Sequence, residues 1–146
     1  MTNTGFQDKS KLYRFGVSLE KPLIDAFDSH IRKQNYRNRS EAIRDLIRNE
    51  LVKRQWTEGG IVAGVIVITY NHHKRDLVSK MLDIQHDFQE YIISTQHIHL
   101  THHNCLEIIA AKGEAAKIEQ LASKLKSLIG VKHVNLGISS LGNETL

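Results

Sequence analysis

The sequence is poor in the residues that would place it in a membrane, an oxidising compartment or a disordered state. It has one cysteine, one proline and one tryptophan among 146 residues. Because a lone cysteine excludes an intrachain disulfide, Cys105 must be a packed apolar side chain, a nucleophile or a metal ligand. One Pro and nine Gly also exclude low complexity, so we expect the chain to fold.

Long apolar runs are absent as well. The longest, IVAGVIVITY at 61–70, is far shorter than the roughly 20 residues that a transmembrane helix requires. The segment 1–13 is polar and lacks the apolar core of a secretory signal. We therefore expect a cytoplasmic protein.

Charge and histidine divide the chain into unlike halves. Residues 1–56 contain 12 Lys and Arg against 7 Asp and Glu, whereas residues 57–146 contain 8 against 9. Eight of the nine histidines lie in the second half. A basic half favours a polyanionic partner and a histidine-rich half favours a metal ion, so the composition indicates two domains with different tasks.

Two helices and a hinge are expected in the basic half. Helical spacing predicts one helix at 21–34 and another from Asn38 to near Lys53, with Glu41 three residues after Asn38 as in a capping box. Paired glycines make 55–60 the expected hinge. We place the domain boundary there, after residue 56.

A strand is expected ahead of these helices, at 12–19, where apolar and polar residues alternate. The basic half contains no second strand to pair with it, and this half is too small to bury a core alone. Two copies would therefore pair their strands antiparallel in a ribbon-helix-helix homodimer. The inward face would cover the helices with Phe15, Val17 and Leu19. The outward face would read the DNA major groove with Arg14, Gly16 and Ser18. The start of the second helix would bind a phosphate at Arg39 and Ser40.

Two other interpretations of the basic half remain open. One is a helix-turn-helix with the turn at 35–38, although a strand ahead of Pro22 would then have no task. The other is a dimerisation module whose basic face is merely solvated.

The second half follows the order β-α-β-β-α-β. Periodicity and turn residues predict strands at 61–70, 91–100, 105–112 and 131–139, and helices at 74–90 and 114–129. This order is that of the ferredoxin-like fold, a sheet with two helices on one face. The whole chain is therefore predicted to be α+β.

The stretch HIHLTHHNC at 97–105 carries four histidines and the lone cysteine in nine positions. His97 and His99 are two apart on a predicted strand, so both side chains leave the same face, and a hairpin can bring Cys105 opposite them. Two residues further on, Glu107 could hydrogen-bond a ligating imidazole. His86, near the end of the preceding helix, is the leading candidate for a fourth ligand.

The remaining histidines and the metal itself are less determined. His30 and His133 are expected to be ordinary surface or core residues, and His72 and His73 at best accessory ligands. For His102 and His103, solvent exposure and a weak accessory metal site both remain open. Thiolate with imidazoles suits Zn, Cu and Ni, and the sequence alone does not choose among them.

Motifs along nearly the whole chain resemble those of the nickel-responsive transcriptional regulators. They are RFGVSL at 14–19, NRSEAIRD at 38–45, HHKRDL at 72–77, IQH at 84–86, HIH at 97–99 and NCLEI at 104–108. The pairing of a ribbon-helix-helix module with such a His/Cys domain is uncommon. The resemblance implies an ACT-type metal domain, a homotetramer built as a dimer of dimers, and a palindromic DNA operator.

The same resemblance implies roles for particular residues. Square-planar Ni(II) would bind His97, His99 and Cys105 of one chain and His86 of another. A second cation would bind Glu41 and Asp45. The residues at base-reading positions would be Arg14, Gly16 and Ser18.

The expected mechanism is linkage, in which nickel favours the disposition of the ribbons that engages DNA. The resemblance implies repression of nickel-uptake genes as the usual outcome. Two rivals are a zinc metalloenzyme with an activated water and a metal-buffering protein without DNA activity. No general base is evident near His97 and His99, so we expect no enzyme.

Overall fold

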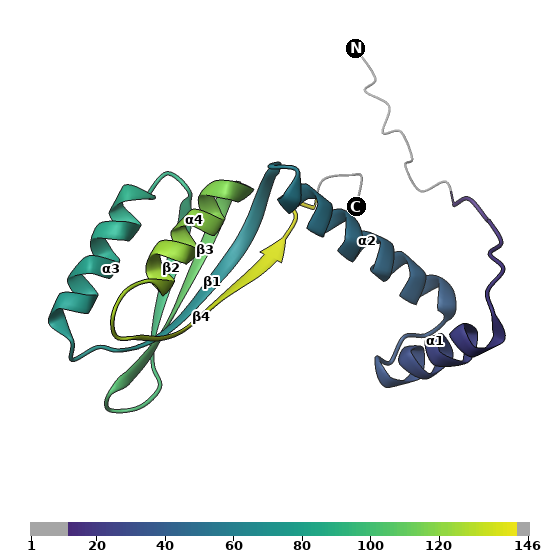
Figure 1. The fold of residues 1–146 in the computed structure, drawn as a ribbon, viewed down its shortest axis with the longest axis horizontal. Coiled ribbons are helices and arrows are strands. Elements are labelled where there is room, and N and C mark those ends of the chain that lie inside the picture. Colours follow the sequence, from purple (N-terminus) through teal and green to yellow (C-terminus); the bar gives the residue numbers. More distant parts are fainter. Residues whose placement is uncertain (1–11, 143–146) are drawn as a thin grey trace, which may run out of the picture. The chain divides into compact units, whose positions relative to one another are not determined.

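The computed structural model describes residues 12–142, and the polar N-terminal arm expected before residue 12 lies outside this range. Figure 1 shows the elements in chain order, with helices coiled and strands as arrows. The helices are α1 (Lys21–Lys33), α2 (Arg39–Thr57), α3 (Arg75–Asp87) and α4 (Ala115–Lys126). The strands are β1 (Ile61–Asn71), β2 (Ile92–His99), β3 (Asn104–Glu114) and β4 (Val131–Ser139).

The chain forms two compact units, the first ending at Ile43 and the second beginning at Arg44. This division lies upstream of the boundary expected after residue 56, because the later turns of α2 pack with the second unit. The expectation that α2 ends near Lys53 is wrong, since the helix continues to Thr57. Trp56 lies in this extra turn and is buried in the second unit, and its burial stabilises the longer helix.

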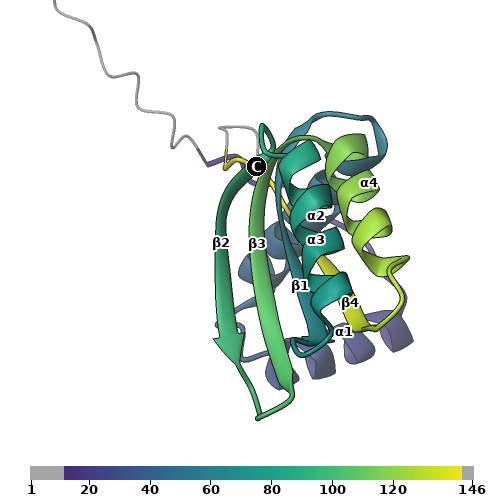
Figure 2. The same ribbon diagram turned by 90° about the vertical axis from the view of Figure 1, so that its left-hand side faces the viewer.

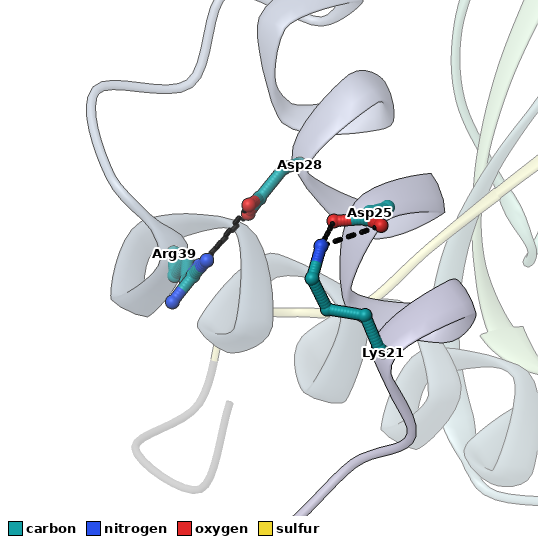
Figure 3. Close-up of polar contacts among 4 residues, drawn as sticks. All are labelled: Lys21, Asp25, Asp28 and Arg39. Carbon is teal, nitrogen blue, oxygen red and sulfur yellow. Dashed lines mark hydrogen bonds and ion pairs between the residues drawn. The ribbon is translucent and has the colours of Figure 1, made fainter.

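The first unit holds α1 and the start of α2 together through polar contacts. Arg39 donates to both carboxylate oxygens of Asp28, at 2.8 Å from Nε and 2.7 Å from Nη2. Figure 3 shows this pair of α1 and α2 beside the Lys21–Asp25 pair within α1. The Arg39 hydrogen bond lowers the pKa of Asp28, so the carboxylate stays charged and the pair persists at neutral pH.

The predicted cap of α2 is confirmed by its contacts. The backbone N–H of Glu41 donates to Asn38 Oδ1 at 2.9 Å, which satisfies one of the free donors of the first helical turn. In a capping box the Glu41 carboxylate would accept from the Asn38 N–H. It accepts instead from the N–H of the preceding residue, Arg37, at 3.0 Å.

Residues 12–20 differ from prediction, because the single chain has no strand there. A strand requires a hydrogen-bonded partner, and within residues 12–142 no other segment pairs with this one. The alternating apolar side chains are therefore left in solvent, with exposed fractions of 75% for Phe15, 62% for Val17 and 40% for Leu19.

The second unit is an antiparallel four-stranded sheet in the order β2-β3-β1-β4. The fold class predicted from the sequence, α+β with a ferredoxin-like second half, is confirmed. Figure 2 shows α3 and α4 side by side on one face of this sheet. Alternate residues of β1 and β3 face these helices and are buried, as period-2 strands require. The main core includes Ile66, Ile68, Leu77, Met81, Ile109, Leu121 and Leu125.

Predicted boundaries agree with the observed ones to within three residues, apart from α2 and the segment 12–19. The strand expected at 131–139 is reproduced as β4. The two helices of the second half are shorter than predicted at their C-terminal ends, because turns follow Asp87 and Lys126.

Trp56 joins the end of α2 to the sheet. Its indole is 5% exposed, packs with Val62 and Ile118, and donates its N–H to the Ser139 carbonyl at 2.9 Å. Gly64 provides the space, since a Cβ there would lie 3.0 Å from the indole ring. A close approach of this kind explains a glycine inside a central strand.

Replacing Trp56 tests this packing. We expect Trp56→Ala to lower the free energy of unfolding by about 3–5 kcal/mol through the cavity it leaves, and Trp56→Phe, which keeps a ring but loses the hydrogen bond, to cost less. Urea unfolding followed by far-UV circular dichroism at fixed protein concentration measures both. Equal losses for the two variants would contradict a packing role for the ring.

Candidate metal centre

Three strand ends converge on Cys105. In the sheet register Cys105 of β3 lies opposite His99 of β2 on one side and Tyr70 of β1 on the other. His72 follows two residues after Tyr70, in the turn that leaves β1. The thiol is fully buried, with 0% exposure, so its polar neighbours come from these strand ends.

Two imidazoles contact the thiol directly. His72 Nδ1 and His99 Nδ1 each lie 3.3 Å from Cys105 Sγ, and the three ligand atoms are within 4.8 Å of one another. A metal with ordinary bond lengths to sulfur and nitrogen holds them about 3.1 Å apart at a right angle and about 3.6 Å apart at a tetrahedral angle. The observed separations fit a metal centre without movement of the backbone.

His72 is predisposed to the neutral form. Partial burial and then the neighbouring imidazoles, led by His73, lower its pKa. A neutral imidazole retains the lone pair that a metal requires, so this environment favours ligation over protonation.

A buried carboxylate lies beside the cluster. Glu107 is 7% exposed and accepts from the Tyr70 hydroxyl at 3.0 Å and from Gln85 Nε2 at 2.6 Å. Gln85 comes from α3, so the carboxylate connects helix and sheet. Burial and then the charge of Glu107 raise the pKa of Tyr70, so its hydroxyl keeps its proton.

The Tyr70 proton determines the tautomer of His97. The hydroxyl oxygen lies 3.2 Å from His97 Nδ1, and its only proton is donated to Glu107. His97 Nδ1 must then donate to the hydroxyl oxygen, which leaves Nε2 with a free lone pair. Tyr70 thus orients His97 as a hydrogen-bonded outer residue orients a metal-ligating histidine.

The structure brings together only part of the ligand set expected from the sequence. His99 and Cys105 are in contact, and the ring centroid of His97 lies 4.9 Å from that of His99. His86 is exposed in the last turn of α3 and joins neither histidine group found among residues 12–142. His72 is the residue that sequence reasoning underrated, because its proximity to Cys105 depends on the pairing of β1 with β3.

Glu107 also differs in detail from expectation. It bonds no imidazole directly and reaches His97 only through Tyr70. The connection from Glu107 to an imidazole therefore passes through the Tyr70 hydroxyl, which period-2 alternation does not reveal.

The residues expected to contact DNA or a second cation lie in and near α2. The predicted base-reading residues, Arg14, Gly16 and Ser18, are all exposed in the single chain. Arg39 and Ser40 begin α2, but the Arg39 guanidinium is engaged with Asp28. Asp45 accepts from Asn49 at 3.3 Å, and neither it nor Glu41 belongs to a histidine group.

Between residues 12 and 142 the structure contains no helix that is both long and apolar enough to traverse a bilayer.

Family models match both halves of the chain. The model for the NikR C terminal nickel binding domain matches residues 63–139, which includes the whole cluster around Cys105. The model for the ribbon-helix-helix protein, copG family, matches residues 13–54. These assignments agree with the ribbon-helix-helix interpretation of the basic half and leave no support for a helix-turn-helix.

Relatives align over nearly their full length. A protein of Chlorobium limicola is 67% identical over 133 residues, 91% of this chain and 99% of its own. One from Syntrophus aciditrophicus is 56% identical over 133 residues, 91% of this chain and 97% of its own. One from Pyrococcus abyssi is 49% identical over 136 residues, 92% of this chain and 99% of its own. All three carry the description "Putative nickel-responsive regulator". The chain belongs to the nickel-responsive transcriptional regulators, a family of DNA-binding, Ni(II)-dependent proteins rather than enzymes.

Proposed function

We propose that this chain represses genes for nickel uptake when its metal centre holds Ni(II). The observation that carries the proposal is the convergence of three strand ends on a buried thiol, with His99 at 3.3 Å and an oriented His97 beside it. A buried sulfur ligand with imidazole partners suits a borderline-soft ion of the nickel class.

The proposed ligands are His97, His99 and Cys105 of one chain and His86 of a neighbouring copy. His97 offers Nε2, because Tyr70 occupies its Nδ1. His86 is exposed on α3, where another copy could reach it. When bound, nickel would join the strand ends of one chain to the helix of the next, so metal binding would be a property of the assembly.

The DNA-binding half requires a second copy. Phe15, Val17 and Leu19 form an apolar stripe in solvent, and a strand without a partner is unstable alone. Antiparallel pairing of residues 12–19 from two copies would bury this stripe and present Arg14, Gly16 and Ser18 to the major groove. A two-fold symmetric reader would select a palindromic operator.

The metal-binding half offers a surface for further assembly into a dimer of dimers. The face of the sheet opposite α3 and α4 carries Val65, Val67, Leu106 and Ile108, which are exposed or only partly buried in the single chain. Apolar residues on an uncovered sheet face are typical of a subunit interface. Burial of this face would produce the tetramer.

Phosphate and cation contacts would assist from α2. The first turn of a helix attracts phosphate, and Arg39 and Ser40 occupy that turn. Because Arg39 is paired with Asp28, its role would be to position the helix start as well as to add charge. Glu41 and Asp45 would hold a weak second cation when DNA is bound.

Regulation would follow from linkage between the two binding events. If the metal centre favours the arrangement of ribbons that fits the operator, operator DNA must raise the metal affinity by the same factor. As a regulator of chromosomal genes, the protein would act in the cytoplasm.

Replacement of single ligands tests the proposed set. Cys105→Ser should abolish the thiolate-to-nickel absorption band, and His97→Ala should weaken nickel binding by more than about 100-fold, because a ligand loss exceeds the effect of an outer partner. His133→Ala, an imidazole of β4 outside both histidine groups, is the matched control and should keep both band and affinity. In competition with a chelator, a larger loss of nickel affinity for His72→Ala than for His97→Ala would place His72 in the set and reject His97.

The orienting hydroxyl gives a separate prediction. Tyr70→Phe removes the acceptor for His97 and one donor to Glu107, so nickel affinity should fall about 10-fold or more while the absorption band persists. Tyr91→Phe, which removes a hydroxyl outside this network, should bind nickel as the unmodified chain does. Identical affinities for the two variants would contradict the tautomer argument.

DNA recognition is testable without a known operator. Selection from random duplexes with NiCl2 present should enrich an inverted repeat, and fluorescence anisotropy should show weaker binding without nickel. Arg14→Ala should cost about 1–3 kcal/mol on that site and relax its sequence, whereas Arg32→Ala, an equal loss of charge in α1, should leave the preference unchanged. Binding indifferent to nickel would dismiss the switch and leave a metal-buffering role.

A further inference from the structure

A second histidine group lies outside the cluster around Cys105. His73 follows β1, and His102 and His103 lie in the turn between β2 and β3. Their ligating nitrogens are all within 4.8 Å of one another. The ring centroids are 5.5 Å apart for His73 and His102, 5.3 Å for His73 and His103, and 4.8 Å for His102 and His103.

The two turns that carry this group are held by their own hydrogen bonds. Asn71 Oδ1 accepts from the His73 N–H at 2.9 Å, and Thr101 Oγ1 accepts from the His103 and Asn104 N–H groups at 3.3 and 3.1 Å. Asn71 and Asn104 are themselves paired across β1 and β3. Strand pairing and these hydrogen bonds therefore hold the backbone of both turns in place.

A contact between the turns prepares one of the ligands. His73 Nε2 lies 3.0 Å from the His102 carbonyl oxygen. Because a carbonyl oxygen only accepts, Nε2 carries the proton and Nδ1 is left with a lone pair for an ion. An outer hydrogen bond of this kind is the usual partner of a metal-ligating histidine.

The separations are within the range of side-chain movement. Ligands of a tetrahedral ion with nitrogen bonds near 2.1 Å lie about 3.4 Å apart, so nitrogens separated by as much as 4.8 Å would approach each other by about 1.4 Å. All three side chains are exposed, and rotation about their χ angles supplies such a shift without disturbing the core.

We propose that His73, His102 and His103 form a second, solvent-exposed site for a divalent ion of the Zn, Ni or Cu class. Three imidazoles favour these ions over Mg or Ca, which prefer oxygen ligands. The site shares no ligand with the cluster around Cys105, although the rings of His72 and His73 are 4.1 Å apart. It contains no thiolate, so it should bind more weakly and add no sulfur-to-metal absorption.

Counting bound ions in the full chain tests the proposal. Equilibrium dialysis against NiCl2, and separately against ZnCl2, should give two ions per chain. The double variant His102→Asn/His103→Asn and the single variant His73→Asn, altered in opposite turns, should each lose the weaker ion or bind it at least about tenfold less tightly. His133→Asn, an exposed imidazole of β4 outside both groups, should retain two ions.

Variants of the two sites have different expected effects. In the double variant the thiolate band should remain, whereas Cys105→Ser should lose the band and keep the weaker ion. Retention of the weaker ion by both His variants, with native circular dichroism, would overturn the proposal. A single ion per unmodified chain at saturation would overturn it too, whether or not that ion produces the thiolate band.

Discussion

The register of β3 between β1 and β2 is the constraint on which the cluster around Cys105 depends. It sets Cys105 opposite both His99 and Tyr70, and so brings three segments far apart in the chain to one buried sulfur. A slip of one residue would turn Cys105 and Glu107 to the other face of the sheet. Burial of alternate residues of β3 beneath α3 and α4 makes such a slip costly, so core packing and ligand geometry are enforced together.

The buried carboxylate of Glu107 determines how the neighbouring polar side chains are oriented. Glu107 has its oxygens satisfied by Tyr70 and Gln85, which removes the usual cost of an unpaired carboxylate in a core. The same contacts commit the Tyr70 proton and thereby orient His97. The network therefore links α3, through Gln85, Glu107 and Tyr70, to an imidazole at the end of β2.

In a single copy, both halves of the chain leave apolar side chains exposed to solvent. Residues 12–20 alternate as a strand does but pair with no strand within residues 12–142, and the sheet face opposite the helices carries apolar residues. Each feature is unfavourable in water for the same reason, since unpaired strand edges and apolar faces favour association. The assembly proposed above would bury both Phe15 and Val65, which are exposed in the single chain.

Local pattern determined much of this protein. Period-2 and period-3.6 spacing predicted the sheet and its two helices, and alternation correctly put His97, His99, Cys105 and Glu107 on one face. These patterns depend on residues close together in the chain, so they can be recognised from the sequence alone. They misjudged the end of α2, where Trp56 packs against residues more than 50 positions away.

Tertiary structure alone decided which residues meet. The contact of His72 with Cys105, the route from Glu107 through Tyr70 to His97, and the meeting of His73 with the turn at 100–103 all require the pairing of β1 with β3. Alternation specifies the face of a side chain but not the residue across from it. Cross-strand register is settled by packing of the whole core, and that information is spread over the chain rather than held in any one motif.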